Sequence, residues 1–415
     1  MSGIKYWVWL NERKGVPLHL RHTLLNYFET PERLYYADTS DYLRAEGMTP
    51  ELANVLADKD TGPASQILGE CQRLGVSILT FQDADYPIRL RNIFEPPCLL
   101  YVRGHLPDID EEVAVAMVGT RDATPYGLVS AQNLSFELAK QGVLIVSGAA
   151  SGIDSASHSG ALLAGAKTVA VLGCGVDVAY PPENERLLAD IAASGAVVSE
   201  YPPGTAPLPQ YFPARNRIIS GLCLATVVVE APLRSGALIT ARTALEQGRE
   251  VFALPGPINV PQSRGSNSLI ARSEAALLQD ADDILREYGE RYPHKLHRVP
   301  VELPKTPGYQ ERQEAKKAKK GRRGAKKTAE EAEQAGGQAP LQTLDVRPGH
   351  TALPDDQICI LKKLKNGTLQ VDELIEAAEL PTRRVLSALT LLQLEDRVTE
   401  SSGKYFSLNV ELIEE

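Results

Sequence analysis

A chain of 415 residues is too long for one ordinary domain and predicts two or three. Its formal net charge of -9 argues against a protein that coats duplex DNA through bulk charge, so any nucleic-acid site must be built from individually placed residues. No apolar run reaches the ~20 residues of a membrane span, and the N-terminus has no signal-peptide pattern, so no membrane segment is predicted and a cytoplasmic protein is expected. The five cysteines are widely separated, which predicts neither a metal site nor a disulfide.

Residues 1–75 are predicted to form a small all-α domain. Apolar side chains recur there at helical spacing, at Leu20, Leu24, Leu25 and Phe28. A helix is expected over residues 38–47, and Thr49 with Pro50 has the order of a cap and first-turn proline for another that reaches Ala57. Gly47 followed by Met48 resembles the glycine-apolar turn of a SAM or helix-hairpin-helix-like domain. The domain therefore has either a purely structural role or an auxiliary contact with DNA.

Residues 76–290 change to alternating strands and helices. Buried strands are predicted at the Val-rich runs Val113–Val118, Val143–Ser147, Thr168–Leu172, Leu224–Val229 and Glu250–Leu254. Continuous apolar runs separated by helical stretches indicate an α/β fold: an extended Rossmann-type, doubly wound parallel sheet covered on both faces. In such a sheet a ligand lies beyond the carboxyl ends of the strands.

The C-terminal third divides into a linker and a small domain. Residues 291–353 have few apolar side chains, and 312–327 are rich in Lys and Arg, so we predict a disordered basic linker that is either a solvated tether or an arm adding nonspecific phosphate affinity. Residues 354–415 read as three helices and a hairpin, the order of a winged-helix domain. Its presumed recognition helix offers only Arg383 and Arg384, which leaves duplex DNA and a protein partner equally open.

Candidate site residues lie where the predicted strands end. The first strand runs into Gly119, Thr120 and Arg121, and the second into a turn that contains Gly148, Ser151 and Gly152. Glycine lets the backbone approach a ligand, helix N-termini attract anions, and an arginine fork suits phosphate oxygens. For Arg121 the alternative is an ion pair with a buried carboxylate such as Glu230.

The other turns add two more groups of candidates. Phe212, Arg215, Asn216 and Arg217 combine an aromatic ring with arginines, as single-stranded nucleic acid requires, although one arginine could instead be a buried ion-pair partner. Ser235, Gly236 and Thr240 begin another helix and offer a second anion site. Asp154 is interpreted as a helix cap and His158 as structural. No cofactor is predicted, because Gly173-Cys174-Gly175 lacks the third glycine of a dinucleotide fingerprint.

Several of these segments occur together in one order: VAMVGTRDATPYG, SGAASGIDSASHSGAL, TVAVLGCGVDVAYPPEN, SEYPPG, FPARNRIISGL, VVVEAPLRSGALITARTALEQGREVFALPG and GSNSLI. Over roughly residues 80–285 this pattern resembles the DprA/Smf family. The resemblance implies a non-catalytic protein that binds single-stranded DNA, displaces the single-strand-binding protein and loads RecA recombinase in natural transformation. It also implies a homodimer formed through the Rossmann domain. The chain departs from the family after GSNSLI, where Ser273-Glu274 replaces the usual Gly-Ala.

Two other functions compete with this interpretation. The wider fold family includes nucleotide phosphoribohydrolases similar to the LOG proteins, which carry a PGGxGTxxE segment with a functional glutamate. The corresponding turn here has no glutamate before Glu246, deep in the predicted helix, so the acid-base role lacks an occupant. A nucleotide-sensing regulator is the third interpretation.

Overall fold

A computed structural model describes residues 3–297, 299–301, 303, 343–347 and 353–413, apart from 366, 379, 396 and 402–404. The chain forms two compact units, 1–309 and 310–415. The predicted basic segment 312–327 lies outside the described residues. In the part that is described, no helix is both long and apolar enough to cross a membrane.

The first 75 residues are helical, as expected. Their helices are α1 (Ile4–Asn11), α2 (Leu18–Phe28), α3 (Pro31–Tyr36), α4 (Thr39–Tyr42), α5 (Pro50–Ala57) and α6 (Gly62–Leu74). The Thr49 side chain accepts a hydrogen bond from the Leu52 amide, which confirms the predicted cap of α5. The helix expected over 38–47 is reduced to α4, because the chain turns at Gly47, where φ is +78° and Leu20 packs against the backbone.

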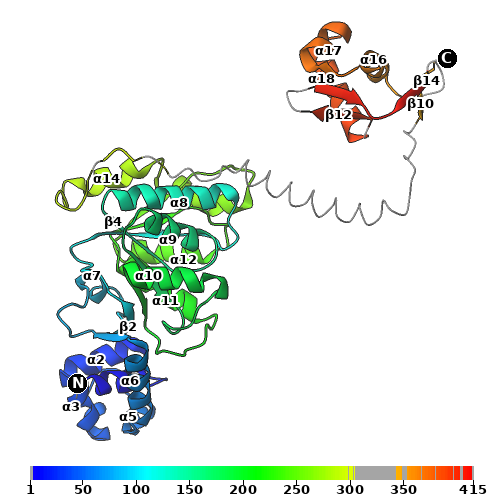
Figure 1. The fold of residues 1–415 in the computed structure, drawn as a ribbon. Helices are drawn as coiled ribbons and strands as arrows, with labels where there is room; N and C mark the ends of the chain where they lie inside the picture. The colour runs from blue at the N-terminus through cyan, green and yellow to red at the C-terminus, as the bar shows by residue number, and fades with distance from the viewer. Residues whose placement is uncertain are drawn as a thin grey trace. The chain divides into compact units, whose positions relative to one another are not determined.

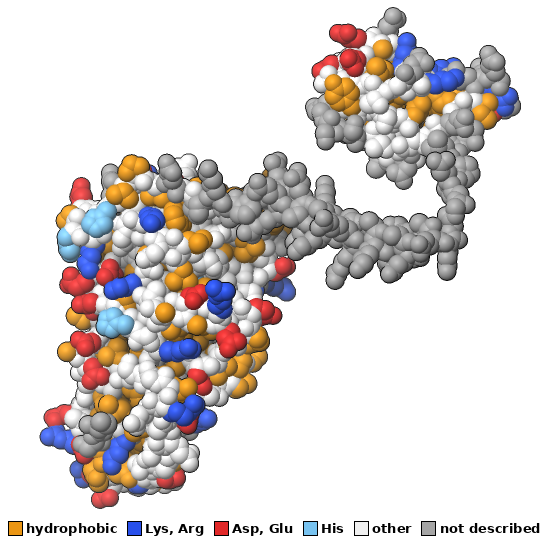
Figure 2. Space-filling view, in the orientation of Figure 1, with side chains coloured by type: hydrophobic (Ala, Val, Ile, Leu, Met, Phe, Trp, Pro, Cys, Tyr) orange, Lys and Arg blue, Asp and Glu red, His pale blue; other side chains and the backbone are white. Residues whose placement is uncertain are grey.

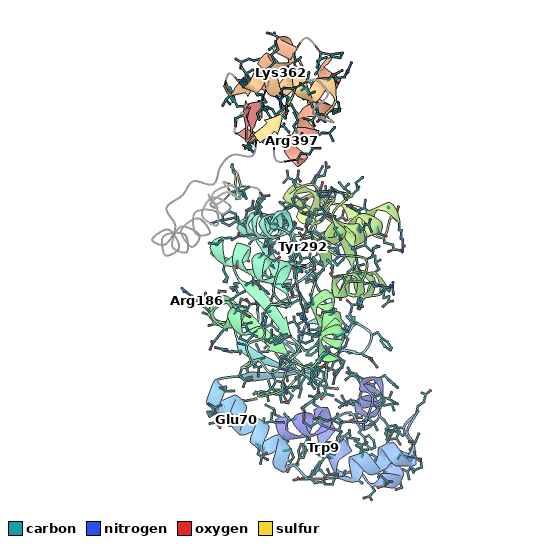
Figure 3. All side chains as sticks on the ribbon, turned by 90° about the vertical axis from the view of Figure 1, so that its right-hand side faces the viewer. Trp9, Glu70, Arg186, Tyr292, Lys362 and Arg397 are labelled. Atoms are coloured by element: carbon teal, nitrogen blue, oxygen red, sulfur yellow. The ribbon has the colours of Figure 1, made fainter. Side chains whose placement is uncertain are left out.

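These helices share their core with the sheet that follows. Trp9, labelled in Figure 3, belongs to a buried cluster that also contains Leu24 and Leu34 from the helices and Ala170 and Leu172 from the sheet. Apolar burial is the main favourable term in folding. The N-terminal helices therefore contribute to the stability of the sheet domain rather than forming a hydrophobic core of their own.

Within residues 3–297 the strands form one nine-stranded sheet in the order β1-β2-β6-β5-β4-β3-β7-β8-β9. The strands are β1 (Ser77–Thr80), β2 (Leu99–Gly104), β3 (Val113–Val118), β4 (Val143–Ser147), β5 (Thr168–Leu172), β6 (Ala196–Ser199), β7 (Ala225–Val228), β8 (Glu250–Ala253) and β9 (Ala276–Leu277). From β6 to β9 every pairing is parallel, which confirms the predicted Rossmann-type sheet. The antiparallel strands β1 and β2 at one edge were not anticipated.

Helices cover both faces of this sheet (Figure 1). They are α7 (Ile88–Arg91), α8 (Pro125–Lys140), α9 (Ile153–Leu163), α10 (Glu185–Ser194), α11 (Tyr211–Gly221), α12 (Gly236–Glu246), α13 (Arg264–Ala271) and α14 (Ala281–Gly289), with 3-10 turns at Pro182–Asn184 and Pro261–Ser263. Alternate residues of β3 point to opposite faces: Ala116 packs with α11 and α12, whereas Val115 packs with α8, α9 and α14. Burial on both faces explains why these strands are continuously apolar.

The strand order reverses beside β3. Strands β4, β5 and β6 lie to one side of β3, and β7, β8 and β9 to the other. The loops that leave β3 and β7 therefore separate at the carboxyl edge of the sheet and open a crevice between them.

The C-terminal unit confirms the winged-helix prediction. It contains β10 (Thr343–Asp345), α16 (Asp355–Leu364), β11 (Leu369–Gln370), α17 (Val371–Ala378), α18 (Thr382–Leu394), β12 (Val398–Ser401), β13 (Tyr405–Leu408) and β14 (Glu411–Ile413). Strands β11, β13 and β12 form the wing sheet, and β10 pairs with β14. In α18 the Arg384 guanidinium is held by both oxygens of Asp356, which leaves less basic charge on the presumed recognition helix.

Candidate nucleic-acid interface

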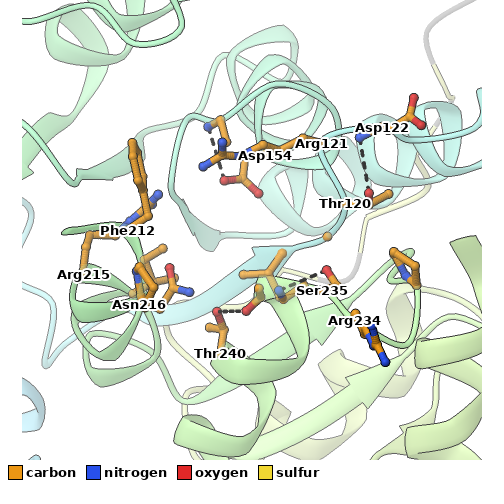
Figure 4. Close-up of a pocket in the computed structure, with 18 residues that line it drawn as sticks. Thr120, Arg121, Asp122, Asp154, Phe212, Arg215, Asn216, Arg234, Ser235 and Thr240 are labelled. Carbon is orange, nitrogen blue, oxygen red and sulfur yellow. Dashed lines mark hydrogen bonds between the residues drawn. The ribbon is translucent and has the colours of Figure 1, made fainter. Parts of the chain in front are cut away.

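A cavity of about 360 Å³ occupies the crevice between the loops after β3 and β7 (Figure 4). Most of the predicted site residues line it: Gly119, Thr120, Arg121, Phe212, Arg215, Asn216, Ser235, Gly236 and Thr240. Gly148, Ser151, Gly152 and Arg217 do not. Segments that lie more than a hundred residues apart in the chain thus meet at one site, although their role in binding stays a prediction.

The loop after β3 is held tightly and presents Arg121 to the solvent. A side chain at Gly119 would collide with Ile153, because a Cβ atom there would lie 2.3 Å from Ile153 Cγ1. The Thr120 amide donates to the Glu230 carbonyl over 2.7 Å. The Arg121 side chain is exposed, and its guanidinium carbon lies 4.9 Å from the centroid of the Phe212 ring.

Arg121 does not pair with Glu230. The buried Glu230 carboxylate accepts hydrogen bonds from the Thr124 amide over 2.9 Å and from the Thr124 hydroxyl over 2.6 Å. Thr124 also caps α8 by accepting from the Gly127 amide. The structural alternative for Arg121 is therefore wrong: Glu230 organises the start of α8, and the Arg121 charge is available in the crevice.

Arg215 is a buried guanidinium that lines the cavity. It is 4% exposed, and its Nη1 donates to the Val171 carbonyl over 2.7 Å. Its Nε has no hydrogen-bond partner, and no carboxylate lies within ion-pair distance of it in the described parts of the chain. A Cβ at Gly148 would lie 1.6 Å from Nη1. Gly148 therefore serves the site indirectly, by leaving room for Arg215.

Arg217 is the arginine that forms the structural ion pair. Its Nη2 donates to both oxygens of Glu200 over 2.8 Å, and both side chains are largely buried. Gly152 has φ +82° and lies against the Thr120 carbonyl, so it also supports the loop rather than lining the cavity. Ser151 is exposed beside it. These contacts give Arg215 and Arg217 different roles, which the sequence pattern alone could not do.

Asp154 is in the cavity, which the sequence reasoning missed. Its Oδ2 accepts from the Ala150 amide over 3.3 Å, so it fixes the turn before α9 rather than capping that helix. Burial raises the pKa of this carboxyl, and the nearby Arg215 and Arg121 charges oppose that rise. Asp122 also lines the cavity, so two carboxylates from outside the β7–α12 turn lie there, whereas the segment from Ala231 into α12 has no glutamate before Glu246.

The turn between β7 and α12 closes the other side. The Ser235 hydroxyl caps α12 by accepting from the Ala237 amide over 3.3 Å, and the buried Thr240 hydroxyl donates to the Gly236 carbonyl. Arg234 also lines the cavity with an exposed side chain and was not predicted. The sequence could have indicated Arg234, because it is the one cation between the end of the predicted strand at Val229 and the helix cap at Ser235.

His158 has the structural role that was predicted. It is fully buried, and its Nδ1 lies 2.8 Å from the Thr168 hydroxyl oxygen. Burial lowers its pKa to about 3. Among the described residues, no group of His, Cys, Asp or Glu is arranged to hold a metal ion.

The cavity has an excess of positive charge on an acidic protein. Arg121, Arg215 and Arg234 face Asp122 and Asp154. Elsewhere on the face shown in Figure 2, acidic and basic side chains are interspersed. The crevice is therefore a place on this protein where an anion would be attracted.

A Rossmann-type domain with an arginine-lined crevice at its topological switch point, followed by a winged helix, defines a protein of the doubly wound class with a candidate anion site. A sequence model of DNA recombination-mediator protein A matches residues 77–289, and a DprA winged helix domain model matches 342–404. The chain therefore belongs to the DprA/Smf family and is a DNA-processing protein, and the hydrolase alternative is not favoured.

Individual relatives and solved structures are similar to this chain. Protein Smf from Synechocystis sp. is 39% identical over 279 residues, which span 66% of this chain and 70% of the relative. The X-ray structure of DprA from Streptococcus pneumoniae aligns with a TM-score of 0.61 and 36% identity over 68% of this chain and 97% of that one. A structure of DprA from Helicobacter pylori, described for its single-stranded DNA binding mode, aligns with a TM-score of 0.48 and 31% identity over 52% of this chain and 97% of that one.

Proposed function

We propose that this chain binds single-stranded DNA in the crevice between the β3 and β7 loops. The observation that carries the proposal is Arg215, a buried guanidinium that lines the cavity without an ion-pair partner among the described residues. The buried Asp154 carboxyl beside it compensates part of this charge. Arg121 and Arg234 still leave the cavity with more cations than carboxylates, so the site favours an anionic ligand. The exposed Arg121 and Arg234 can contact further phosphates of an extended strand.

The aromatic wall supports a single strand rather than a duplex. Phe212 lines the cavity, and the Arg121 guanidinium lies over its ring. The centroids of the Phe212 and Tyr180 rings are 5.3 Å apart. Unpaired bases stack on such rings with little sequence preference, whereas paired bases are not available for stacking. Binding should therefore be nearly independent of sequence.

The proposed biological role is the one that the family resemblance implies. The protein would protect incoming single-stranded DNA, displace the single-strand-binding protein and load RecA in the cytoplasm during natural transformation. It would act without catalysis and as a homodimer. The carboxyl of Asp154 accepts from the Ala150 amide and lies near the Arg215 and Arg121 charges, which suits a role in fixing this turn and balancing charge better than one in acid-base chemistry.

Titration with a fluorescent oligonucleotide tests the proposal. We expect binding of a single strand in preference to its duplex, with log affinity falling linearly against log salt by about 0.7 per phosphate neutralised. Nucleoside monophosphate, incubated in parallel, should remain intact. Equal affinity for duplex and single strand, a flat salt dependence, or release of free base would overturn the proposal.

A further inference from the structure

A second cavity, of about 270 Å³, lies where the N-terminal helices meet the sheet domain. Asn11, Lys14 and Arg21 line it from the helical side, and Tyr201 and Tyr211 from the sheet side. The Asn11 side-chain amide donates to the Glu200 backbone carbonyl over 3.4 Å and links the two sides. Figure 1 shows α11, which begins at Tyr211, on the side of the sheet domain toward these helices.

The two cavities are adjacent along the chain. Tyr211 lines the second cavity, and the next residue, Phe212, lines the first. The Tyr211 and Tyr201 rings are stacked, with centroids 4.1 Å apart and planes 28° apart. An aromatic surface therefore continues around the first turn of α11 from the arginine-lined crevice to the second cavity.

The charges of the second cavity also suit a nucleotide. The Arg21 guanidinium is fixed by donating to the carbonyls of Val16, Asn11 and Arg13. Neither Arg21 nor the exposed Lys14 forms an ion pair within residues 3–297.

Two carboxylates, Glu12 and Glu200, line this cavity together with Lys14 and Arg21. Glu200 forms an ion pair with Arg217, which leaves Glu12 as the acidic group opposite the two cations. Burial raises the pKa of the Glu12 carboxyl, while the charges of Lys14 and Arg21 oppose that rise. The cavity thus offers stacked rings beside two cations that face a single remaining carboxylate.

We propose that this second cavity is an additional nucleotide subsite, in which a base of the bound strand packs against the Tyr201–Tyr211 pair and its phosphate lies at Lys14. The inference rests on the proposed function, because the strand reaches this subsite from the crevice. Stacking and a backbone cation are the two elements of sequence-independent single-strand recognition. The N-terminal helices would then contact DNA through their junction with the sheet domain.

Oligonucleotide length separates the two sites. The full chain is titrated with oligothymidylates of about 5 and about 20 nucleotides, the shorter being sufficient for the crevice alone. Tyr201→Leu should weaken binding of the longer strand by roughly 5- to 150-fold and of the shorter strand little, because the longer strand can no longer stack a base at this position. Tyr201→Phe keeps the ring and should retain affinity for both. Thermal unfolding of each variant shows whether the fold is intact.

A charge reversal provides a second variant. Lys14→Glu should weaken the longer strand selectively, whereas Lys167→Glu, at an exposed lysine just before β5, makes the same charge change away from both cavities and should have no effect. A brominated longer strand should photocrosslink to Tyr201 itself, as located by sequencing of the crosslinked peptide.

The outcomes distinguish the subsite from the crevice. Unchanged affinity of Tyr201→Leu and Lys14→Glu for the longer strand, or crosslinks confined to the crevice, would overturn the subsite while leaving the proposed function in place. Failure of the wild-type protein to bind either strand would instead overturn the proposed function.

Discussion

Replacement of Arg121 by Ala should weaken single-strand binding by about ten- to a hundredfold and leave the fold intact. A charge-assisted hydrogen bond contributes roughly 1.5–3 kcal/mol, and about 1.4 kcal/mol corresponds to a factor of ten in affinity. The side chain is exposed and is not joined to Glu230. The substitution removes the cation–π interaction between this guanidinium and the Phe212 ring, which contributes about 0.5–1 kcal/mol at an exposed site, so the free energy of unfolding should fall by no more than that.

Oligonucleotide titration and thermal unfolding of the same preparation decide the matter. Arg121→Lys should recover only part of the affinity, because a point charge does not reproduce the planar fork of a guanidinium. Arg186→Ala is the matched control, since this arginine is 95% exposed on α10 and does not line the cavity. A large fall in melting temperature with unchanged affinity would refute the reasoning and assign Arg121 to the scaffold.

Three further predictions concern the surroundings of the site. Gly148→Ala should displace the Arg215 guanidinium, lowering single-strand affinity and destabilising the fold by about 1–3 kcal/mol; unchanged affinity would show that Arg215 is not used. A chain ending at residue 309 should keep its affinity at physiological salt, because both cavities lie in the first unit, and loss of binding would place the site in the remainder. Burial among three aromatic rings lowers the pKa of Lys59 to about 8. The unfolded chain therefore holds this proton up to higher pH than the folded one, and stability should rise as pH increases from 8 towards 10. Melting curves of Lys59→Met should lack that increment.

The sequence by itself determined the main strands and helices and the edge of the sheet at which the candidate site lies. Continuous Val-rich runs predicted β3, β4, β5, β7 and β8, since strands buried on both faces require apolar side chains throughout. Capping residues such as Thr49 located helix starts, because a cap is a contact between neighbours in the chain. The carboxyl ends of parallel strands then brought Gly119, Arg121 and Ser235 to one crevice.

Only the tertiary structure decided what each charged side chain does. The sequence motif presents Arg215 and Arg217 alike, but Arg217 is neutralised by Glu200, and Arg215 donates to Val171, 44 residues away. Asp154 looked like a helix cap until the fold placed it beside Arg215 in the cavity. The physical reason is range: helix and strand patterns depend on neighbours a few residues apart, whereas charge compensation and burial depend on partners that are distant in sequence and meet only when the chain folds.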